Sequence, residues 1–336
     1  MSPKGRPKGE QAPKRVSAKA RSLTSLQDAA RPADAPVAVT GATGFIGRAF
    51  CARASANGRA VRRFVHTPDA AAIGSVAIDL TRATVDDLAR HLETVSTVIH
   101  LAGRAHVMRE TETNADAVYR LANADATECL ARAAVAAGVR RFVLASSVKV
   151  NGERTEPGRP FRPDDPTVPE DAYARSKLAA EVAVRKVAHG TPMEAVVLRL
   201  PLVHGPGVRG NFRRLVDAVR ARRILPLGAI ENRRSLVGLA NLLDALDAAI
   251  DAPALHGVHF VADARSVSTP ELVRAIARAL EVEPQIVRVP VALLRLAGLV
   301  TARSDAVARL VNSLEVDVSS FVAATRWRPR AFALDL

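Results

Sequence analysis

Thr40-Gly-Ala-Thr-Gly-Phe-Ile-Gly47 places three glycines at intervals of three between a short apolar run and a helix-forming stretch. Residues 37–40 predict a strand and residues 45–56 predict a helix. This order brings a helix N-terminus, with its unpaired N–H groups and positive dipole end, to the end of a buried strand. Gly41 permits the turn, Gly44 lets the backbone approach a ligand, and Gly47 lets the helix pack on the strand. The stretch predicts a dinucleotide site, although glycine turns also serve as plain connectors.

The composition is that of an ordinary globular protein, with 48% hydrophobic and 24% charged residues in a chain of 336. Such a length accommodates one large α/β domain or two lobes with a shared core. No apolar run reaches the roughly 18–20 residues of a membrane span, and the start of the chain lacks the apolar region of a secretory signal. We therefore expect a cytoplasmic protein without membrane insertion. Cys51 and Cys129 are too few for a disulfide framework and are expected to be reduced core thiols.

A net charge of +14 raises the question of nucleic-acid binding. Part of this charge lies in residues 1–34, which are rich in Pro, Ser, Ala and charge and predict a disordered basic tail. Such a tail could touch anionic surfaces. A non-catalytic dinucleotide-binding or nucleic-acid-associated scaffold is therefore kept as an alternative, with nucleic acid the less expected partner.

From residue 35 onward, short β-branched runs alternate with longer amphipathic segments. The expected strands are residues 37–40, 60–65, 75–79, 97–101, 141–145, 195–200 and 258–261. The expected helices are residues 45–56, 85–92, 114–137, 171–187, 212–221, 239–250 and 271–280. This alternation predicts an α/β fold, a Rossmann-type doubly wound parallel sheet with a smaller C-terminal substrate lobe. We expect a dinucleotide-binding domain over residues 35–205. Residues 206–336 are expected to form mainly the substrate lobe, with some segments returning to the first domain.

Tyr173 and Lys177 are spaced so that the ammonium lies beside the phenol on one helix face. An adjacent cation favours phenolate, so we expect Lys177 to lower the pKa of Tyr173 and make the phenol an acid/base group. Ser147, at the carboxyl end of a predicted strand, can hydrogen-bond the reacting oxygen. A surface lysine and a turn-capping serine are the plainer interpretations. His100, His106, His204 and Cys129 show no metal-ligand spacing, so no metal is expected.

Several further motifs stand in order along the chain, and together they resemble the extended short-chain dehydrogenase/reductases that act on nucleotide sugars. The resemblance covers roughly residues 36–330. Besides the glycine motif it rests on Asp79-Leu80, Val98-Ile-His-Leu-Ala-Gly103, Ser146-Ser-Val-Lys-Val-Asn-Gly152, Tyr173-x-x-x-Lys177 and Leu198-Arg-Leu-Pro-Leu-Val-His-Gly-Pro206. Within the family the chain is most similar to bacterial UDP-sugar 4-epimerases and UDP-4-keto-6-deoxy-N-acetylhexosamine 4-reductases of surface-polysaccharide synthesis. The family's usual Val-Tyr-Gly is replaced by Val150-Asn-Gly152 and Val203-His-Gly205.

The resemblance implies the roles of the site residues. Ser147, Tyr173 and Lys177 would be catalytic, and Ser147, Asn211 and Arg234 would bind a UDP-sugar, with the last two at its pyrophosphate. The implied cofactor-binding residues are Gly41, Gly44, Phe45, Ile46, Gly47, His66, Asp79, Leu80, Leu101, Ala102, Gly103, Asn123, Tyr173 and Lys177. The resemblance also implies a homodimer, formed through the helices expected at residues 114–137 and 171–187.

The sequence leaves the choice between NAD and NADP open. A carboxylate about twenty residues past the glycines would bind the ribose 2′-hydroxyl and favour NAD. Here that neighbourhood is Arg62-Arg-Phe-Val-His66-Thr, without a carboxylate until Asp69. We therefore expect tolerance of NADP, although arginines at the end of a strand can also be plain surface residues. Whether the enzyme is an epimerase or a reductase also stays open, because both reactions need the same three side chains.

Overall fold

In the part of the chain that the computed structural model describes (residues 35–67, 74–105 and 114–336), seven parallel strands form one central sheet in the order β3-β2-β1-β4-β5-β6-β9. Its strands are β1 (Val37–Thr40), β2 (Val61–Val65), β3 (Ser75–Ala77), β4 (Thr97–His100), β5 (Arg141–Ser147), β6 (Glu194–Leu200) and β9 (Gly257–Phe260). The order reverses between β1 and β4, so loops leaving these two strands diverge. Open α/β sheets bind ligands at the carboxyl ends of strands at such a point.

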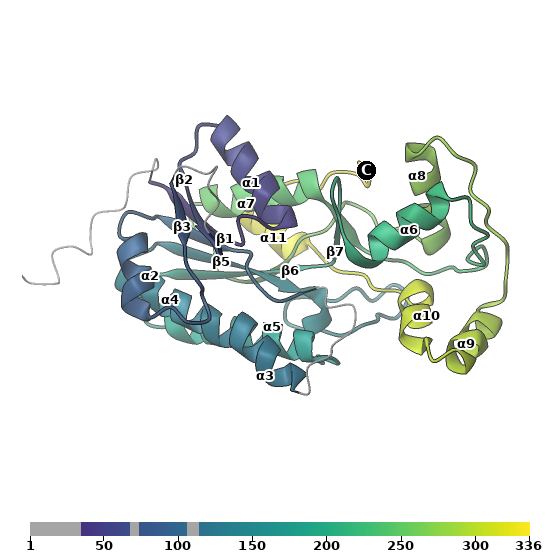
Figure 1. Ribbon diagram of the computed structural model, residues 1–336, viewed down its shortest axis with the longest axis horizontal. Coiled ribbons are helices and arrows are strands. Elements are labelled where there is room, and N and C mark those ends of the chain that lie inside the picture. Colours follow the sequence, from purple (N-terminus) through teal and green to yellow (C-terminus); the bar gives the residue numbers. More distant parts are fainter. Residues whose placement is uncertain (1–34, 68–73, 106–113) are drawn as a thin grey trace, which may run out of the picture. The chain divides into compact units, whose positions relative to one another are not determined.

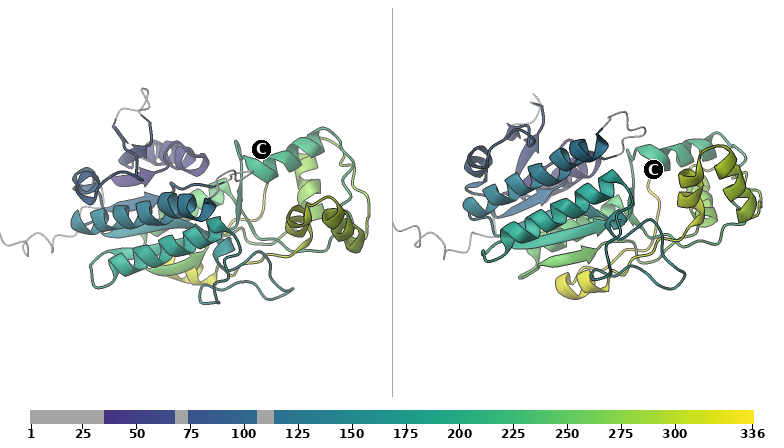
Figure 2. Two further views of the ribbon diagram at one scale, coloured as in Figure 1. Left: turned by 60° about the horizontal axis from the view of Figure 1, so that its bottom comes forward. Right: turned by 90° about the horizontal axis from the view of Figure 1, so that it is seen from below.

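Helices cover both faces of this sheet (Figures 1 and 2). One face packs against α1 (Phe45–Ala56), α7 (Leu239–Asp251) and α11 (Ser319–Thr325), around Phe50, Leu242 and Phe321. The other packs against α2 (Val85–Leu92), α4 (Ala126–Ala136) and α5 (Ala172–Ala188). The predicted doubly wound α/β fold is confirmed. The central strands β1, β4, β5 and β6 are buried and mostly apolar because both of their faces are covered.

A separate apolar cluster lies in the C-terminal half of the chain, between α6 (Gly210–Arg220) and α8 (Thr269–Ala279). A two-stranded parallel sheet, β7 (Leu202–His204) and β8 (Leu236–Gly238), leads into it. Helices α9 (Val291–Val300) and α10 (Ser304–Val311) follow α8. From this half of the chain, β9 pairs with β6 in the central sheet and α7 packs on one face of that sheet. The division into domains at residue 205 stays a prediction.

A capping box fixes the start of α8. The Ser268 side chain accepts from the Glu271 backbone N–H, Glu271 accepts from the Ser268 N–H, and Pro270 lies inside the first turn.

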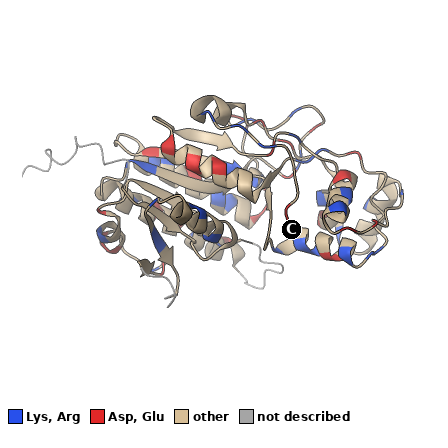
Figure 3. Cartoon of the chain, turned by 90° about the horizontal axis from the view of Figure 1, so that it is seen from above, with Lys and Arg blue, Asp and Glu red and all other residues tan. Residues whose placement is uncertain are grey.

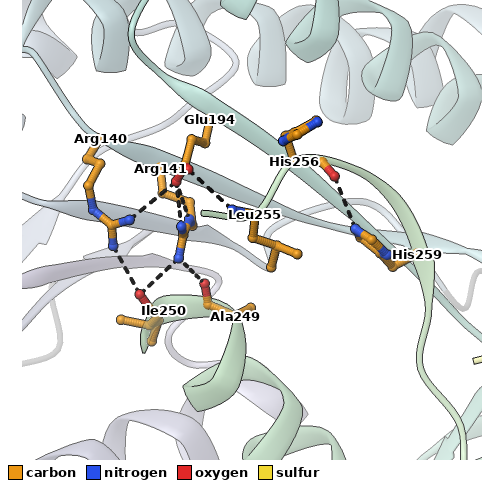
Figure 4. A network of polar contacts seen from close by, with 8 residues as sticks. All are labelled: Arg140, Arg141, Glu194, Ala249, Ile250, Leu255, His256 and His259. Carbon is orange, nitrogen blue, oxygen red and sulfur yellow. Dashed lines mark hydrogen bonds and ion pairs between the residues drawn. The ribbon is translucent and has the colours of Figure 1, made fainter. Parts of the chain in front are cut away.

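The amino end of the sheet is fastened by a buried arginine (Figure 4). Arg141, which begins β5 and is fully buried, donates from Nε to Glu194 Oε2 at 2.7 Å and from Nη1 to the carbonyl of Ala249 at 2.6 Å. Arg140 donates to the same Glu194 carboxylate at 3.2 Å and to Ile250 O at 3.0 Å. The two arginines thus satisfy carbonyls that the last turn of α7 leaves open. This network fixes the beginning of the strand whose other end carries Ser147.

Residues 1–34 lie outside the described part, as do Asp69 and His106, so the basic tail stays a prediction. Among the described residues, no helix is both long and apolar enough to span a bilayer. Cys51 and Cys129 are free thiols, and burial raises the pKa of both.

Candidate active site

Ser147 and Tyr173 meet where β5 ends and α5 begins. A hydrogen bond joins their hydroxyl groups. The start of α5 is fixed by Asp171, whose carboxylate accepts from the Ala174 N–H at 2.7 Å. Lys149, two residues past Ser147, holds the same carboxylate at 2.8 Å. A helix cap and an ion pair therefore set the position of the phenol relative to the end of the strand.

The expected lowering of the Tyr173 pKa is wrong for the protein alone. Burial raises the pKa of Tyr173 to about 12, and only the hydrogen bond from Ser147 opposes this. Lys177 does not outweigh burial because its ammonium points elsewhere: its Nζ donates to the carbonyl of Ala145 at 2.7 Å. The phenol is thus a proton donor at neutral pH.

Lys177 lies beside the loop that follows β4. Lys177 is only 7% exposed. A Cβ added to Gly103 would lie 3.7 Å from the Nζ of Lys177. Burial lowers the pKa of Lys177 to about 8, while the Glu181 carboxylate acts in the opposite direction. Ser147, Tyr173, Lys177 and Gly103 are therefore brought to one edge of the sheet, as the sequence predicts.

Asn123 is held by a distortion that the sequence analysis missed. The single helix expected over residues 114–137 is instead α3 (Ala115–Arg120), the π-helical turn η2 (Leu121–Asp125) and α4. Asn123 is buried in this turn, where its Oδ1 accepts from Arg104 N at 2.7 Å and its Nδ2 donates to Ser176 Oγ at 2.9 Å. It thus ties the loop after β4 to α5. Single π-turns often mark functional sites, but no sequence periodicity reveals them.

The glycine turn is shaped to accept a dinucleotide. Gly41 has φ +66°, and a Cβ there would lie 2.7 Å from the Ala102 backbone nitrogen. A Cβ on Gly47 would lie 2.1 Å from the Gly41 carbonyl oxygen. Helix α1 begins at Phe45, followed by Ile46, and Gly44 is its N-cap. Gly44 has no side chain that could accept hydrogen bonds from the first N–H groups of the helix. These groups stay available to an anion, so the residues present fit a pyrophosphate.

His100 connects the glycine turn to Asn123 through Thr127, which donates its hydroxyl to the Asn123 carbonyl at 2.5 Å. Its Nδ1 lies 2.6 Å from Thr40 Oγ1, which also accepts from Ala102 N, and its Nε2 lies 2.8 Å from Thr127 Oγ1. Burial lowers the pKa of His100 to about 3, so the ring is neutral. Among the described residues, no group of three or more His, Cys, Asp or Glu side chains is placed to hold a metal.

The end of β2 carries fewer free cations than the sequence suggests. Arg62 donates to His91 O at 2.5 Å and to Thr94 at 3.1 Å, and Arg63 hydrogen-bonds Cys51. His66 is 75% exposed, with its Nδ1 4.0 Å from the Asp79 carboxylate.

Asp79 itself accepts from Thr81, a hydrogen bond that lowers the pKa of its carboxyl, and Leu80 packs against the adjoining core. His66 and Asp79 therefore lie close together, where the adenosine part of the dinucleotide is expected to bind.

The predicted substrate residues are only partly brought together. Arg234 is half-buried and donates to Asn312 O at 3.0 Å. Glu153 and Arg309 both act electrostatically on Arg234, and Arg309 also acts on Asp171. Arg234 and the Asp171 cap of α5 are thus both within electrostatic range of Arg309. Arg309, an exposed residue of α10, was missed because no motif surrounds it. Asn211 is exposed in the first turn of α6, and no contact of the described residues links it to Tyr173.

Both departures from the family's Val-Tyr-Gly have structural uses. Asn151 is buried and accepts from Arg199 Nη1 at 2.9 Å. His204 lies 3.2 Å from Asp263 and stacks on Phe212, which anchors the start of α6. Neither side chain replaces a predicted catalytic group.

Lys and Arg are spread over the helices of the C-terminal half (Figure 3). Arg309 is exposed on α10 and Arg234 is half-buried shortly before β8, so an anionic substrate would meet positive charge there.

Comparison with known proteins agrees with this geometry. The model of the NAD dependent epimerase/dehydratase family matches residues 37–262. The chain is 38% identical over 300 residues to a UDP-glucose 4-epimerase of Vibrio cholerae, covering 87% of this chain and 90% of that protein. It is 32% identical to a dTDP-4-dehydrorhamnose reductase of Mycobacterium tuberculosis, covering 74% and 77%. Among solved structures, MoeE5 in complex with UDP-glucuronic acid and NAD superposes with a TM-score of 0.70 at 27% identity, covering 88% and 94%.

Proposed function

Because this chain belongs to the NAD dependent epimerase/dehydratase family, we propose that it moves a hydride at C4 of a UDP-linked hexose, with NAD or NADP as the hydride carrier. The observation that supports this proposal most strongly is that Ser147, Tyr173 and Lys177 lie close together beside Gly103. The UDP-glucose 4-epimerase relative and the UDP-sugar complex of MoeE5 support this substrate class. Surface-polysaccharide synthesis is the proposed context, and the metabolites involved favour a cytoplasmic enzyme.

The three side chains divide the proton chemistry among them. The Tyr173 phenol gives a proton to the C4 oxygen when the sugar is reduced and takes it back when the sugar is oxidised. Ser147 holds that oxygen by a hydrogen bond. Lys177 would bind the cofactor ribose as an ammonium. Because its Nζ is held by the Ala145 carbonyl in the protein alone, it would stabilise the phenolate only once the cofactor is bound. NAD, when bound at the glycine turn, supplies the hydride acceptor.

The same residues serve an epimerase and a 4-keto reductase, and the chain has relatives of both kinds. The test is to supply a UDP-hexose and, separately, a UDP-4-keto-hexose while absorbance at 340 nm is followed. An epimerase converts the first without net change in absorbance. Net oxidation of the reduced cofactor by the second shows a reductase. Conversion of neither substrate contradicts the proposal.

The alternative of a non-catalytic scaffold is disfavoured because the catalytic side chains are intact. Removing residues 1–34 tests it. Unchanged turnover together with lost retention on RNA or DNA makes the tail's affinity incidental to the chemistry. A full-length chain that never turns over a sugar, and whose retention on RNA or DNA depends on residues 1–34, supports the scaffold.

We propose that Arg234 binds the substrate pyrophosphate, assisted by Arg309. Replacing Arg234 with methionine should raise KM for the UDP-sugar about 10- to 100-fold, the loss expected for one charged hydrogen bond. Steady-state kinetics check this. Arg233→Met is the matched control because Arg233 is exposed and lies near Glu271, 3.9 Å away. Equal KM values for the two variants would contradict the assignment.

The carboxyl end of β2 should decide between NAD and NADP. Since Arg62 and Arg63 already have partners within the fold, tolerance of NADP rests on the missing carboxylate at position 66. His66→Asp adds one beside Asp79 and should lower kcat/KM for NADP about tenfold or more by repelling the 2′-phosphate. Cofactor-dependent rates check this. Arg62→Gln should leave the ratio of NADP to NAD use unchanged, and a larger effect from Arg62 would reverse the assignment.

We also propose a homodimer through α3, η2, α4 and α5. Leu121 in η2 is 48% exposed and Val182 in α5 is 55% exposed, so apolar side chains stand on the helices expected to meet. Sedimentation of the purified chain measures its oligomeric state.

A further inference from the structure

Lys177 has a buried carboxylate one helical turn beyond it. Tyr173, Lys177 and Glu181 follow each other at intervals of four along α5 and therefore share one face of the helix. Lys177 is 7% exposed and Glu181 is 1% exposed. The carboxylate is thus buried in the layer that holds the catalytic ammonium, yet the proposed chemistry gives it no role.

Glu181 is bound on its far side by a second cation. Arg199 of β6 donates from Nη2 to Glu181 Oε2 at 2.7 Å and from Nε to Oε1 at 3.1 Å. Ser146, next to the catalytic serine, donates its hydroxyl to the same carboxylate. Arg199 is in turn held by Asn151 at 2.9 Å and by Pro163 O at 3.3 Å. The Glu181 carboxylate is therefore paired with Arg199, and it lies one helical turn from Lys177, whose Nζ is held by the Ala145 carbonyl next to Ser146.

Burying these charged side chains costs desolvation free energy, and apolar side chains in the same place would not carry this cost. Buried ion pairs add little net stability compared with apolar residues of similar size. A buried ammonium, in contrast, loses its proton readily, and a nearby carboxylate prevents this. Without Glu181, the buried Lys177 and Arg199 side chains would both lose their nearby negative charge. The lysine would then lose its proton first, because arginine stays charged.

We propose that Glu181 is a positioning residue that keeps Lys177 protonated, and that Arg199 limits how much of the Glu181 charge reaches Lys177. The inference rests on the proposed function for its meaning, since Lys177 acts there as a cation. The titratable or charged groups around Lys177 are His100 from β4, Arg199 from β6, Tyr173 and Glu181 from α5, and the Lys149–Asp171 pair at the helix cap. His100 is neutral and Lys149 is paired, which leaves Glu181 as the adjusting group.

The direct test is the titration of Lys177 by NMR in the full chain labelled with ¹³C at lysine Cε. The sequence has seven lysines, so the spectrum is simple, and Lys177→Arg assigns the signal. In Glu181→Gln the midpoint of Lys177 should fall by about 1 pH unit or more. In Arg199→Gln it should rise, because Glu181 then faces Lys177 alone. Lys186, exposed on the same helix, should not move and serves as the internal reference.

A double variant guards against loss of folding. Glu181→Gln with Arg199→Gln removes both charges and leaves neither unpaired. The Lys177 midpoint should again fall, with a melting transition showing that the chain is folded. An unchanged midpoint in a folded single or double variant overturns the proposal. Failure of both to fold also overturns it, because the pair then has only a structural role.

Turnover gives a second, separate measurement. The alkaline limb of the rate profile should follow the Lys177 midpoint, to lower pH in Glu181→Gln and to higher pH in Arg199→Gln. If the NMR midpoints move but the parent chain converts no UDP-hexose, the proposed function fails and this inference stands. If turnover is normal and the midpoints do not move, the inference fails alone.

Discussion

Phenylalanine in place of Tyr173 is expected to lower kcat about 100-fold or more, the usual contribution of a positioned acid/base group. The variant keeps the ring and loses only the hydroxyl that meets Ser147. With no proton donor at the C4 oxygen, charge develops there without compensation. Affinity for the dinucleotide should change little, because the glycine turn is untouched. Turnover of a UDP-sugar and calorimetric titration with NAD measure the two effects separately.

Tyr119 provides the matched control for this experiment. It is the other tyrosine of the chain, and its ring lies edge-on to that of Tyr173 with centroids 6.2 Å apart. Tyr119→Phe removes a hydroxyl from the same region without touching the acid/base group. We expect it to retain most of the parent activity. Equal losses in the two variants would show that removing either hydroxyl from this region lowers activity, and would contradict a specific acid/base role for Tyr173.

Alanine at Gly47 should have the second largest effect. The added Cβ would lie 2.1 Å from the carbonyl oxygen of Gly41, which is backbone and cannot rotate away. Either α1 moves off the glycine turn or the turn opens. Overpacking of this kind costs about 1–3 kcal/mol of unfolding free energy. The displaced N–H groups should also weaken NAD binding about tenfold or more. Chemical denaturation and calorimetric titration measure these quantities.

Gly238→Ala is the control for the substitution at Gly47. A Cβ there meets its nearest atom, on His204, at 3.4 Å, so it has room. We expect this variant to bind NAD as the parent chain does. If Gly47→Ala also bound NAD unchanged, the glycine turn would not be the pyrophosphate site.

Much of the fold follows from local patterns in the sequence. Val37–Thr40 and residues 45–56 have the predicted bounds because a fully buried strand is a continuous apolar run and the glycine turn marks where it ends. The strands β7 and β8 were missed because three residues are too few to show a period. The turn η2 was missed because a π-helix inserts one residue without disturbing the apolar spacing on either side.

The candidate site was predictable where spacing alone defines geometry. Tyr173 and Lys177 share a helix face by their separation, and Ser147 ends a strand, so their meeting could be expected. Tertiary contacts decided the rest. Burial decided the direction of the Tyr173 pKa shift. The hydrogen bond of Arg62 to the His91 carbonyl depended on a segment that packs beside β2 only in the folded chain. Glu181 and Arg199, eighteen residues apart, gave no signal of a shared ion pair in the sequence.

The most direct test of hydride transfer at C4 is the fate of deuterium placed at that carbon of a UDP-hexose. We predict that turnover slows with deuterium at C4 but not at C3. When the product is an epimer, the label should stay at C4. Loss of the label to solvent, or an equal effect from deuterium at C3, would contradict the proposed chemistry.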